Sequence, residues 1–352
     1  MAMALLEIEG LSVDFPSAGG MVRAVDGVSL ALSAGERLGV VGESGSGKSL
    51  AMLAVMGLVP YPGRVTARRL AFKGRDLLRL SARERRRLAG KSIAMIFQEP
   101  TTSLNPCFTI GFQLVEGLRA HERLGRMAAR ACAVELLEQV GIPAAPERMR
   151  AYPHQLSGGM NQRVMIAMAI ACNPEILIAD EPTTALDVTI QAQILELLTS
   201  LQRDRGMGLI LITHNMGVVA DTTRRVVVMY GGQIVEERST AALFHAPQHP
   251  YTAALMAARP GQGDSARLAT IPGAPPGLHD RPAGCLFAPR CAYATQRAQA
   301  VRPELRDWMG GRVRCHYPLG EAGRDARIAA DGALGAAPAL GATPALGAQP
   351  AP

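Results

Sequence analysis

Short apolar runs, separated by segments of helical periodicity, organise the central part of the chain. Such runs are typical of strands buried inside a sheet, and we expect strands at 38–41, 92–97, 176–179 and 209–213. Apolar residues at helical spacing predict helices at 51–56, 110–121, 127–140, 164–172 and 188–205. The helices at 110–121 and 127–140 indicate a helical lobe inserted between the second and third of these strands.

Two hairpin-like patterns flank this region. Segments 8–15 and 22–32 are predicted to be short strands around a loop, together forming an antiparallel flap. A β-hairpin is expected at 226–230 and 233–237, turned by Gly231 and Gly232.

The composition changes toward the C-terminus. Proline and glycine become frequent from 259 to 282, which is typical of a linker, and a small loop-rich module is expected at 285–318. The remainder repeats Ala-Leu-Gly-Ala between prolines, and we expect it to be disordered. The predicted division of the chain is 1–258, 259–318 and 319–352.

The overall composition is that of a globular protein. Of 352 residues, 48% are hydrophobic and 19% are charged, and this length gives room for one large domain and a smaller one. The net charge of +7 suits phosphate ligands, anionic lipid surfaces or nucleic acid. A mildly basic globular surface explains it equally well, so the charge does not select a partner.

The hydropathy pattern also indicates a compartment. No apolar run approaches the roughly 18 residues that a membrane-spanning helix needs, and the first residues lack the basic start of a signal peptide. We therefore expect a cytoplasmic protein. In a reducing compartment its six cysteines are expected to remain thiols.

A glycine-rich turn lies between the first predicted buried strand and the helix that follows it. Residues 42–49 have the G-x-x-x-x-G-K-S spacing of a phosphate-binding loop. Glycine at 42, 45 and 47 leaves room for backbone N–H groups to wrap a polyphosphate at the start of the helix. Lys48 would then contact the β- and γ-phosphates, and Ser49 would contact Mg²⁺. An ordinary glycine-rich turn is the alternative.

Polar side chains stand at the ends of the other predicted buried strands, where α/β sheets bind ligands. Asp180 fits a carboxylate that holds Mg²⁺, and Glu181 fits a general base for an attacking water, a role worth about 10²–10⁴ in rate. Gln98 and His214 could orient that water and contact the γ-phosphate. A buried structural histidine or a turn at Asp-Glu-Pro would explain each residue singly, but their joint occurrence with Lys48 favours a catalytic site.

A second anion-binding pattern lies at the start of the helix predicted at 164–172. Ser157 followed by Gly158 and Gly159 is typical of a helix N-terminus that binds an anion, and it is separate from the first loop.

Taken together, these segments resemble the nucleotide-binding subunits of ABC transporters over about residues 5–240. The matching motifs are the Walker A loop at 42–49, which includes Ser44, the Q-loop residue Gln98, the signature at 156–159 continued by Gln162 and Arg163, the Walker B strand at 176–181, the D-loop Ala185, Leu186 and Asp187, and the H-loop residue His214. The resemblance implies an α/β fold with a RecA-like P-loop NTPase core, an antiparallel β subdomain and a helical subdomain at about 99–172. Asn215 is a small difference, because an acid often follows the histidine.

The resemblance also implies ligands. ATP and Mg²⁺ are the expected cofactors, with Ser49, Gln98 and Asp180 at the metal ion and Phe15 stacked on the adenine. The residues implied at the nucleotide are Gly42, Ser44, Gly45, Gly47, Lys48, Ser49, Ser157, Gly159 and Asp187.

Partners follow from the same resemblance. In that family two cassettes pair head to tail, and Ser157 and Gly159 of one contact the γ-phosphate that Lys48 of the other binds. ATP closes the pair and hydrolysis reopens it. The implied partners are a second ATPase subunit, often a paralogue, two transmembrane permease subunits and, indirectly, an extracytoplasmic solute-binding protein, with no nucleic acid. The implied location is peripheral, on the cytoplasmic face of the inner membrane.

A closer resemblance is to the ATP-binding subunits of bacterial dipeptide and oligopeptide importers, in segments 99–106, 152–156, 180–193 and 249–252 and in the C-terminal cysteine module. Nickel and glutathione importers have much the same sequence in these segments, so the resemblance does not identify the transported solute. The rival from another class is a soluble ABC ATPase of translation or DNA repair, whose second cassette or long insertions this sequence does not contain. A non-catalytic regulator is a further rival, and Glu181 argues against it.

Some dipeptide-importer members carry an iron–sulfur cluster on four cysteines of this module. Three of those positions are matched by Cys285, Cys291 and Cys315, and the remaining one holds Ala298. Thiolates are the usual cluster ligands, so three cysteines leave an open iron site or no cluster. His316 or His279 could take the fourth place, and the alternative is a module without metal that is retained for its packing.

Overall fold

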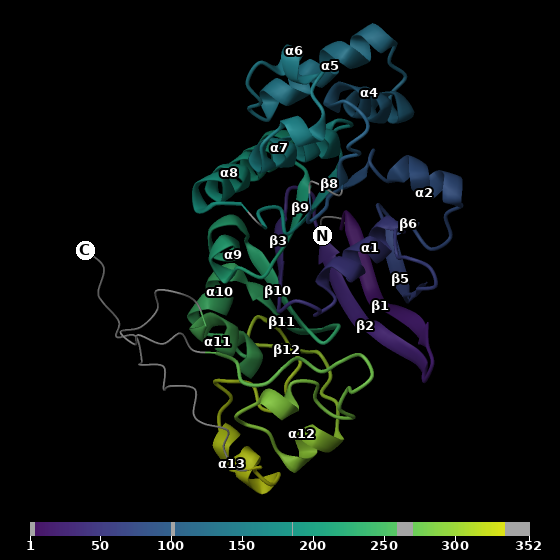
Figure 1. Ribbon diagram of the computed structural model, residues 1–352. Coiled ribbons are helices and arrows are strands. Elements are labelled where there is room, and N and C mark those ends of the chain that lie inside the picture. The colour runs from purple at the N-terminus through teal and green to yellow at the C-terminus, as the bar shows by residue number, and fades with distance from the viewer. Residues whose placement is uncertain (1–3, 100–102, 185, 259–269, 335–352) are drawn as a thin grey trace, which may run out of the picture.

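The four predicted buried strands lie side by side and parallel in a central sheet. The computed structural model describes residues 4–99, 103–184, 186–258 and 270–334. The four strands are β3 (Arg37–Val41), β7 (Ile93–Ile96), β8 (Ile176–Asp180) and β9 (Gly208–Thr213). The predicted hairpin forms β10 (Arg225–Tyr230), which is parallel to β3, and β11 (Gln233–Ser239). The order across this eight-stranded sheet is β12-β13-β11-β10-β3-β9-β8-β7 (Figure 1).

Side chains of the central strands alternate between two buried clusters. Ile176 and Ile178 of β8 belong to a cluster with α1 (Lys48–Met56) and the N-terminal strands. Leu177 and Ala179 belong to a cluster with the helical lobe and two helices, α7 (Gly158–Ile170) and α8 (Val188–Arg205). Because both faces are covered, these strands are apolar at nearly every position, which is why short continuous runs identified them.

The N-terminal flap is a five-stranded antiparallel sheet. Its strands are β1 (Leu6–Ser17), β2 (Gly20–Leu32), β4 (Arg64–Thr66), β5 (Arg69–Phe72) and β6 (Arg75–Asp76). β1 and β2 pair with Ile8 opposite Leu30. Both strands are longer than the predicted segments, because the chain reverses over only Ala18 and Gly19.

The predicted helical lobe lies between β7 and β8 in the chain and at the top of Figure 1. Its helices are α4 (Ile110–His121), α5 (Arg126–Gln139) and α6 (Ala145–Arg148), followed by a short 3-10 turn, η1 (Pro153–Gln155). The side-chain oxygen of Thr109 accepts a hydrogen bond from the N–H of Phe112 and caps α4. Leu114, Leu118 and Leu137 are buried, so one face of the lobe joins the cluster above α7.

Four more short helices complete the cassette. They are α2 (Ala82–Leu88), α9 (Met216–Thr222), α10 (Thr240–His245) and α11 (Pro250–Ala257). Of these, α9 packs against the central strands β3 and β9. No helix in the part of the chain that the structure describes is both long and apolar enough to span a bilayer.

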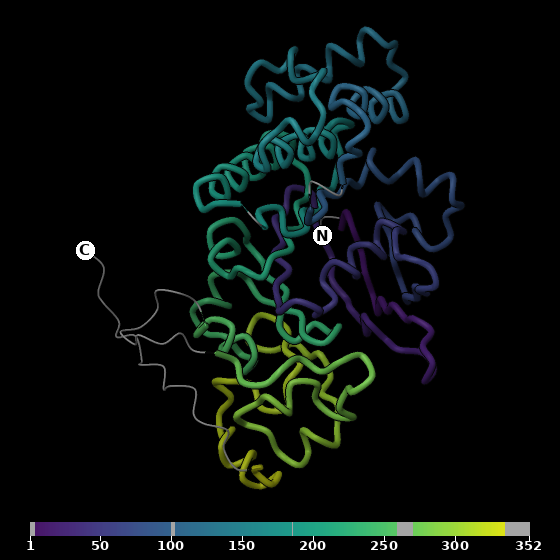
Figure 2. Tube along the Cα trace, in the orientation of Figure 1, coloured from purple at the N-terminus to yellow at the C-terminus, as the bar shows by residue number. Residues whose placement is uncertain are grey.

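The C-terminal module extends the central sheet. Its elements are η2 (Ala288–Arg290), α12 (Gln296–Ala300), β12 (Arg306–Trp308), β13 (Gly311–Val313) and α13 (Arg324–Ala330). β13 pairs antiparallel with β11, with Val313 opposite Glu236. Figure 2 shows this yellow-green part of the trace lying directly beneath the hairpin of β10 and β11.

The structure differs from the predicted boundary at 318 and 319, because the chain remains folded through 334. Tyr317 hydrogen-bonds Asp331 after α13, and the N–H of Leu334 donates to the carbonyl oxygen of Ala294 at 3.1 Å. Contacts with residues elsewhere in the module stabilise this alanine-rich stretch. The hydropathy pattern of the stretch does not reveal such contacts, so the sequence did not predict that it folds. The rest of the predicted tail (335–352), most of the predicted linker (259–269) and Ala185 of the D-loop lie outside the described residues.

Candidate functional site

Residues 42–49 connect β3 to α1 at the carboxyl end of the central strands. Gly42 has a backbone φ of 153°, and a Cβ atom there would lie 2.2 Å from the carbonyl oxygen of Met229. Gly45 has a φ of 76° and faces open space, with no atom within 4 Å of the place of a Cβ. Gly47 is the N-cap of α1 and Ser44 is exposed. The loop therefore turns tightly and leaves Gly45 uncovered close to the N-terminus of a helix, where anions bind.

Lys48 is buried inside this loop. Its Nζ donates hydrogen bonds to the carbonyl oxygens of Gly42 (2.7 Å) and Glu43 (2.9 Å). Burial lowers the pKa of the Lys48 ammonium group, and the carboxylates of Glu181 and Asp180 oppose that shift. The ammonium group thus lies between the loop and the strand-end carboxylates.

Asp180, the last residue of β8, reaches the start of α1. Its Oδ1 accepts a hydrogen bond of 2.8 Å from the hydroxyl of Ser49. Burial raises the pKa of the Asp180 carboxyl group, and the bond from Ser49 opposes the shift. A hydroxyl and a carboxylate oxygen side by side are the hard donors that Mg²⁺ prefers, so these residues fit the predicted metal ion.

Glu181 brings together three polar side chains at one carboxylate oxygen. Its Oε2 lies 3.3 Å from Nε2 of Gln98, 2.9 Å from Oγ1 of Thr184 and 3.2 Å from Nδ1 of His214. The backbone φ of Glu181 is 45°, a left-handed value that non-glycine residues rarely adopt. Strain of this kind is typical of functional positions. The structure therefore brings Gln98, Glu181 and His214 into one cluster beside Asp180.

The second predicted anion site begins α7. Ser157 is the exposed N-cap of that helix and accepts a hydrogen bond from the N–H of Met160. A Cβ atom on Gly159 would lie 3.0 Å from the side chain of Ile190 in α8, whose own N-cap is Asp187. Within the described residues, no hydrogen bond joins Ser157 or Asp187 to the loop at 42–49.

Phe15 lies in β1, outside this cluster. Its ring packs at the edge of the buried N-terminal cluster, next to Gly63, where a Cβ atom would lie 2.7 Å from the ring. Its role in stacking on adenine stays a prediction.

Three residues near the site were not singled out from the sequence. Thr184 donates to Glu181, the hydroxyl of Tyr251 accepts from the N–H of Glu43 at 2.8 Å, and Arg290 pairs with the carboxylate of Glu43. Thr184 and Tyr251 lie in two of the segments that carried the closer resemblance. The sequence similarity of those segments indicated no role for either residue, and no sequence pattern pointed to Arg290.

The cysteines of the C-terminal module do not fit the predicted iron–sulfur site. Burial raises the pKa values of the Cys285 and Cys315 thiols and that of Cys291 to about 12. Ala298 uses its backbone to bond Thr295 and Cys285, and Nε2 of His316 lies 2.8 Å from the carbonyl oxygen of Val301. Within the ranges that the structure describes, no three His, Cys, Asp or Glu side chains are grouped as metal ligands. The cluster is therefore unsupported.

Family profiles match two parts of the chain. A profile described as "ABC transporter" matches residues 25–184, and one described as "Oligopeptide/dipeptide transporter, C-terminal region" matches residues 235–297. The second match joins β11 to the C-terminal module, in agreement with the shared sheet.

Individual proteins are similar over most of the chain. The dipeptide transport ATP-binding protein DppD of Escherichia coli K12 is 56% identical over 324 residues, which covers 92% of this chain and 99% of that protein. The oligopeptide transport ATP-binding protein OppD of Bacillus subtilis 168 is 51% identical over 293 residues, or 82% of each chain. The dimeric structure of MJ0796, a bacterial ABC transporter cassette, matches with a TM-score of 0.60 and 27% identity over 67% of this chain and 98% of that one.

These matches agree with the geometry of the loop and the strand-end carboxylates. The chain therefore belongs to the ABC transporter family of ATP-binding proteins, in the group that contains the dipeptide and oligopeptide transport subunits.

Proposed function

We propose that the chain is the ATP-binding and ATP-hydrolysing subunit of an ABC importer for dipeptides or oligopeptides. The observation that carries the proposal is the convergence of Gln98, Thr184 and His214 on one oxygen of Glu181, beside the Asp180–Ser49 contact. The identity to DppD and OppD supports the peptide class of solute.

In this proposal each group has a separate task. Lys48 would contact the β- and γ-phosphates, and Ser49, Asp180 and Gln98 would hold Mg²⁺, which would supply positive charge next to the phosphates. Glu181 accepts the proton of the attacking water, while His214 keeps that carboxylate and the water aligned. The Ser49–Asp180 distance of 2.8 Å and the Glu181–His214 distance of 3.2 Å support these roles.

Replacing the proposed base tests the mechanism. The Glu181→Gln variant keeps the size of the side chain and its hydrogen-bonding capacity but cannot take a proton, so ATP binding should persist while turnover falls by about 10²–10⁴. Lys48→Ala is the matched variant that should lose binding. Undiminished turnover in Glu181→Gln would contradict the assignment of the base.

We propose that a second cassette completes the site. Ser157 and Gly159 are exposed or half-buried at the start of α7 and have no hydrogen bond to the loop at 42–49 of their own chain. That placement suits a γ-phosphate bound by another copy or by a paralogue. The similar cassette MJ0796 has a dimeric structure, which supports the pairing.

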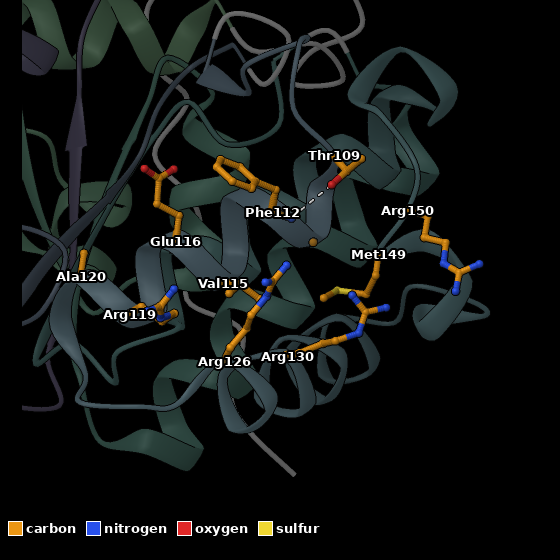
Figure 3. A pocket seen from close by; sticks show the side chains of 11 residues that line it. Thr109, Phe112, Val115, Glu116, Arg119, Ala120, Arg126, Arg130, Met149 and Arg150 are labelled. Carbon is orange, nitrogen blue, oxygen red and sulfur yellow. Dashed lines mark hydrogen bonds between the residues drawn. The ribbon is translucent and has the colours of Figure 1, made fainter.

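The permease partners are proposed to contact the helical lobe. A cavity of about 770 Å³ lies between α4, α5 and the residues that follow α6. Figure 3 shows the side chains that line it, which include the exposed Phe112 and four arginines, Arg119, Arg126, Arg130 and Arg150. A second, apolar cavity of about 290 Å³ lies between α1, β7 and α7 and is lined by Leu58 and Phe97 among others. The second cavity includes Phe97, the residue before Gln98, so a partner bound there would be affected by changes at the nucleotide.

Coexpression with the permease subunits of a dipeptide importer tests the assembly. The full complex should form at the cytoplasmic face of the membrane and take up labelled dipeptide, and Arg126→Glu with Arg130→Glu should lose copurification while retaining ATP binding. Arg203→Glu, the same charge reversal on α8, is the control. Uptake of nickel or glutathione instead of dipeptide would assign a different solute to the importer. Copurification with ribosomes or DNA would favour a soluble ABC ATPase.

A further inference from the structure

The C-terminal module contacts the phosphate-binding loop through one side chain. Arg290, the last residue of η2, makes a two-pronged ion pair with Glu43: Nη1 lies 2.7 Å from Oε2, and Nη2 lies 3.0 Å from Oε1. The two residues are 247 positions apart in the sequence. The Arg290 side chain is 4% exposed, so the pair is shielded from water on the arginine side.

The segment before η2 and the strand β10 together hold the guanidinium group of Arg290 in place. Nε of Arg290 donates to the carbonyl oxygen of Pro272 at 2.9 Å, and Nη1 donates to the hydroxyl of Tyr230 at 3.3 Å. The guanidinium carbon also lies 5.8 Å from the centre of the Tyr230 ring. A planar guanidinium that is bonded on several edges presents its remaining N–H groups in one direction, which suits paired recognition of a carboxylate.

Glu43 connects this ion pair to Lys48. Its backbone N–H donates to the hydroxyl of Tyr251, and its carbonyl oxygen accepts from Nζ of Lys48 at 2.9 Å and from the N–H of Ser46 at 3.2 Å. Glu43 therefore binds Arg290 through its side chain and positions Lys48 through its main-chain carbonyl group.

We propose that Arg290 is a positioning residue for nucleotide binding: it fixes Glu43, and through Glu43 the loop and Lys48, in the conformation that receives the phosphates. The inference rests on the proposed function of residues 42–49 as the ATP-binding loop. A loop ordered in advance loses less conformational freedom when the ligand binds, so the C-terminal module contributes to affinity without touching the ligand.

The test measures Mg-ATP affinity and turnover of the full-length chain carrying Arg290→Gln, Glu43→Gln or both. Each single variant should raise the KM and the dissociation constant for ATP by about tenfold, a change of roughly 1.4 kcal/mol, and change kcat by less. The double variant should bind no more weakly than either single one, because both remove the same contact. Arg290→Lys, which keeps the charge, should recover part of the affinity.

Arg302→Ala is the matched control. Arg302 also joins the module to the cassette, through Asp26 at 3.3 Å, but none of its hydrogen bonds reaches residues 42–49. Its KM should equal that of the parent. An equal rise in KM in Arg302→Ala, or parental affinity in both Arg290→Gln and Glu43→Gln, would overturn the proposal.

Two further comparisons keep the result interpretable. If Arg290→Gln does not fold, Glu43→Gln decides the question alone, since Glu43 is partly exposed and its replacement leaves the module intact. Parental ATP affinity in Lys48→Ala would instead refute the loop assignment itself. Loss in Lys48→Ala with parental affinity in the Arg290 and Glu43 variants would refute only the positioning role.

Discussion

At the scale of single residues, the site is concentrated on one carboxylate. Hydrogen bonds from Gln98 and Thr184, and the ring of His214 beside the same oxygen, restrict the rotation of the Glu181 side chain. The left-handed backbone of Glu181 fixes where that side chain begins. A general base acts well only when it is oriented toward the proton it removes. The neighbours of Glu181 are therefore expected to affect turnover more than binding.

Thr184→Val tests this expectation at a residue whose hydroxyl donates to the base. Valine has the same shape but cannot donate to Glu181, and a hydrogen bond to a charged group contributes about 1.5–3 kcal/mol. We expect kcat to fall by about tenfold with little change in KM. Thr199→Val is the control, since the Thr199 hydroxyl bonds only backbone of its own helix. A rise in KM without loss of kcat would contradict the argument.

Most of this cluster could be predicted because the ends of buried strands can be recognised in the sequence. Gln98, Asp180 and His214 each follow a short apolar run, and parallel strands bring their carboxyl ends to one edge. Thr184 was missed because a hydroxyl in a turn has no pattern of its own. Arg290 was missed for a different reason: its partner is 247 residues away, and local periodicity carries no such pairing.

At the scale of elements, the start of α11 depends on buried polar groups. The carboxylate of Glu236 in β11 accepts from the N–H groups of Gln248 (2.7 Å) and His249 (2.8 Å). His249 is the N-cap, and its Nδ1 accepts from the N–H of Tyr251 at 3.0 Å. The imidazole must stay neutral to accept this bond, and its burial lowers the pKa of His249 to about 3.

This depressed pKa predicts a pH dependence of stability. The unfolded chain binds a proton at His249 below about pH 6.5, whereas the folded chain does not until about pH 3, so the stability from this group is complete above pH 6.5 and is lost as the pH falls. Between pH 7 and pH 5 the loss should be about 2 kcal/mol. Asparagine can cap the helix without titrating, so His249→Asn should flatten this part of the curve in urea unfolding.

His245→Asn is the matched control for that measurement. His245 is exposed in α10, so its replacement should leave the pH dependence as in the parent. An equally steep loss of stability in His249→Asn would assign the acid sensitivity to other groups.

Short elements were the least predictable part of the fold. β12 and β13 have three residues each, and neither has room for a periodic pattern. β13 is positioned by pairing with β11, in which Glu237 bonds Arg312 of β13, and β12 is positioned by pairing with β13. The predicted division at 258 therefore separates segments that share one sheet.

At the scale of the whole molecule, the C-terminal module shares a core with the cassette. Phe287 packs against Tyr230 and Tyr251 with ring centres 5.3 Å apart in both pairs. Leu286 is buried in the same cluster, and Nε1 of Trp308 donates to Oε1 of Gln248 at 3.0 Å. The module thus covers apolar side chains of the cassette as well as the edge of β11.

Truncation separates the folded module from the predicted tail. A chain ending at Ala258 would expose Tyr230 and Tyr251 and leave β11 as an unpaired edge strand, which favours aggregation. Burial of each large apolar side chain contributes about 1.5–3 kcal/mol, so this truncation should lower the melting temperature sharply and give aggregates in size-exclusion chromatography. A chain ending at Leu334 keeps every contact described above and should match the parent. If the shorter chain melted and eluted as the parent does, the module would be a separate domain, and its coupling to the phosphate-binding loop could not rest on a shared core.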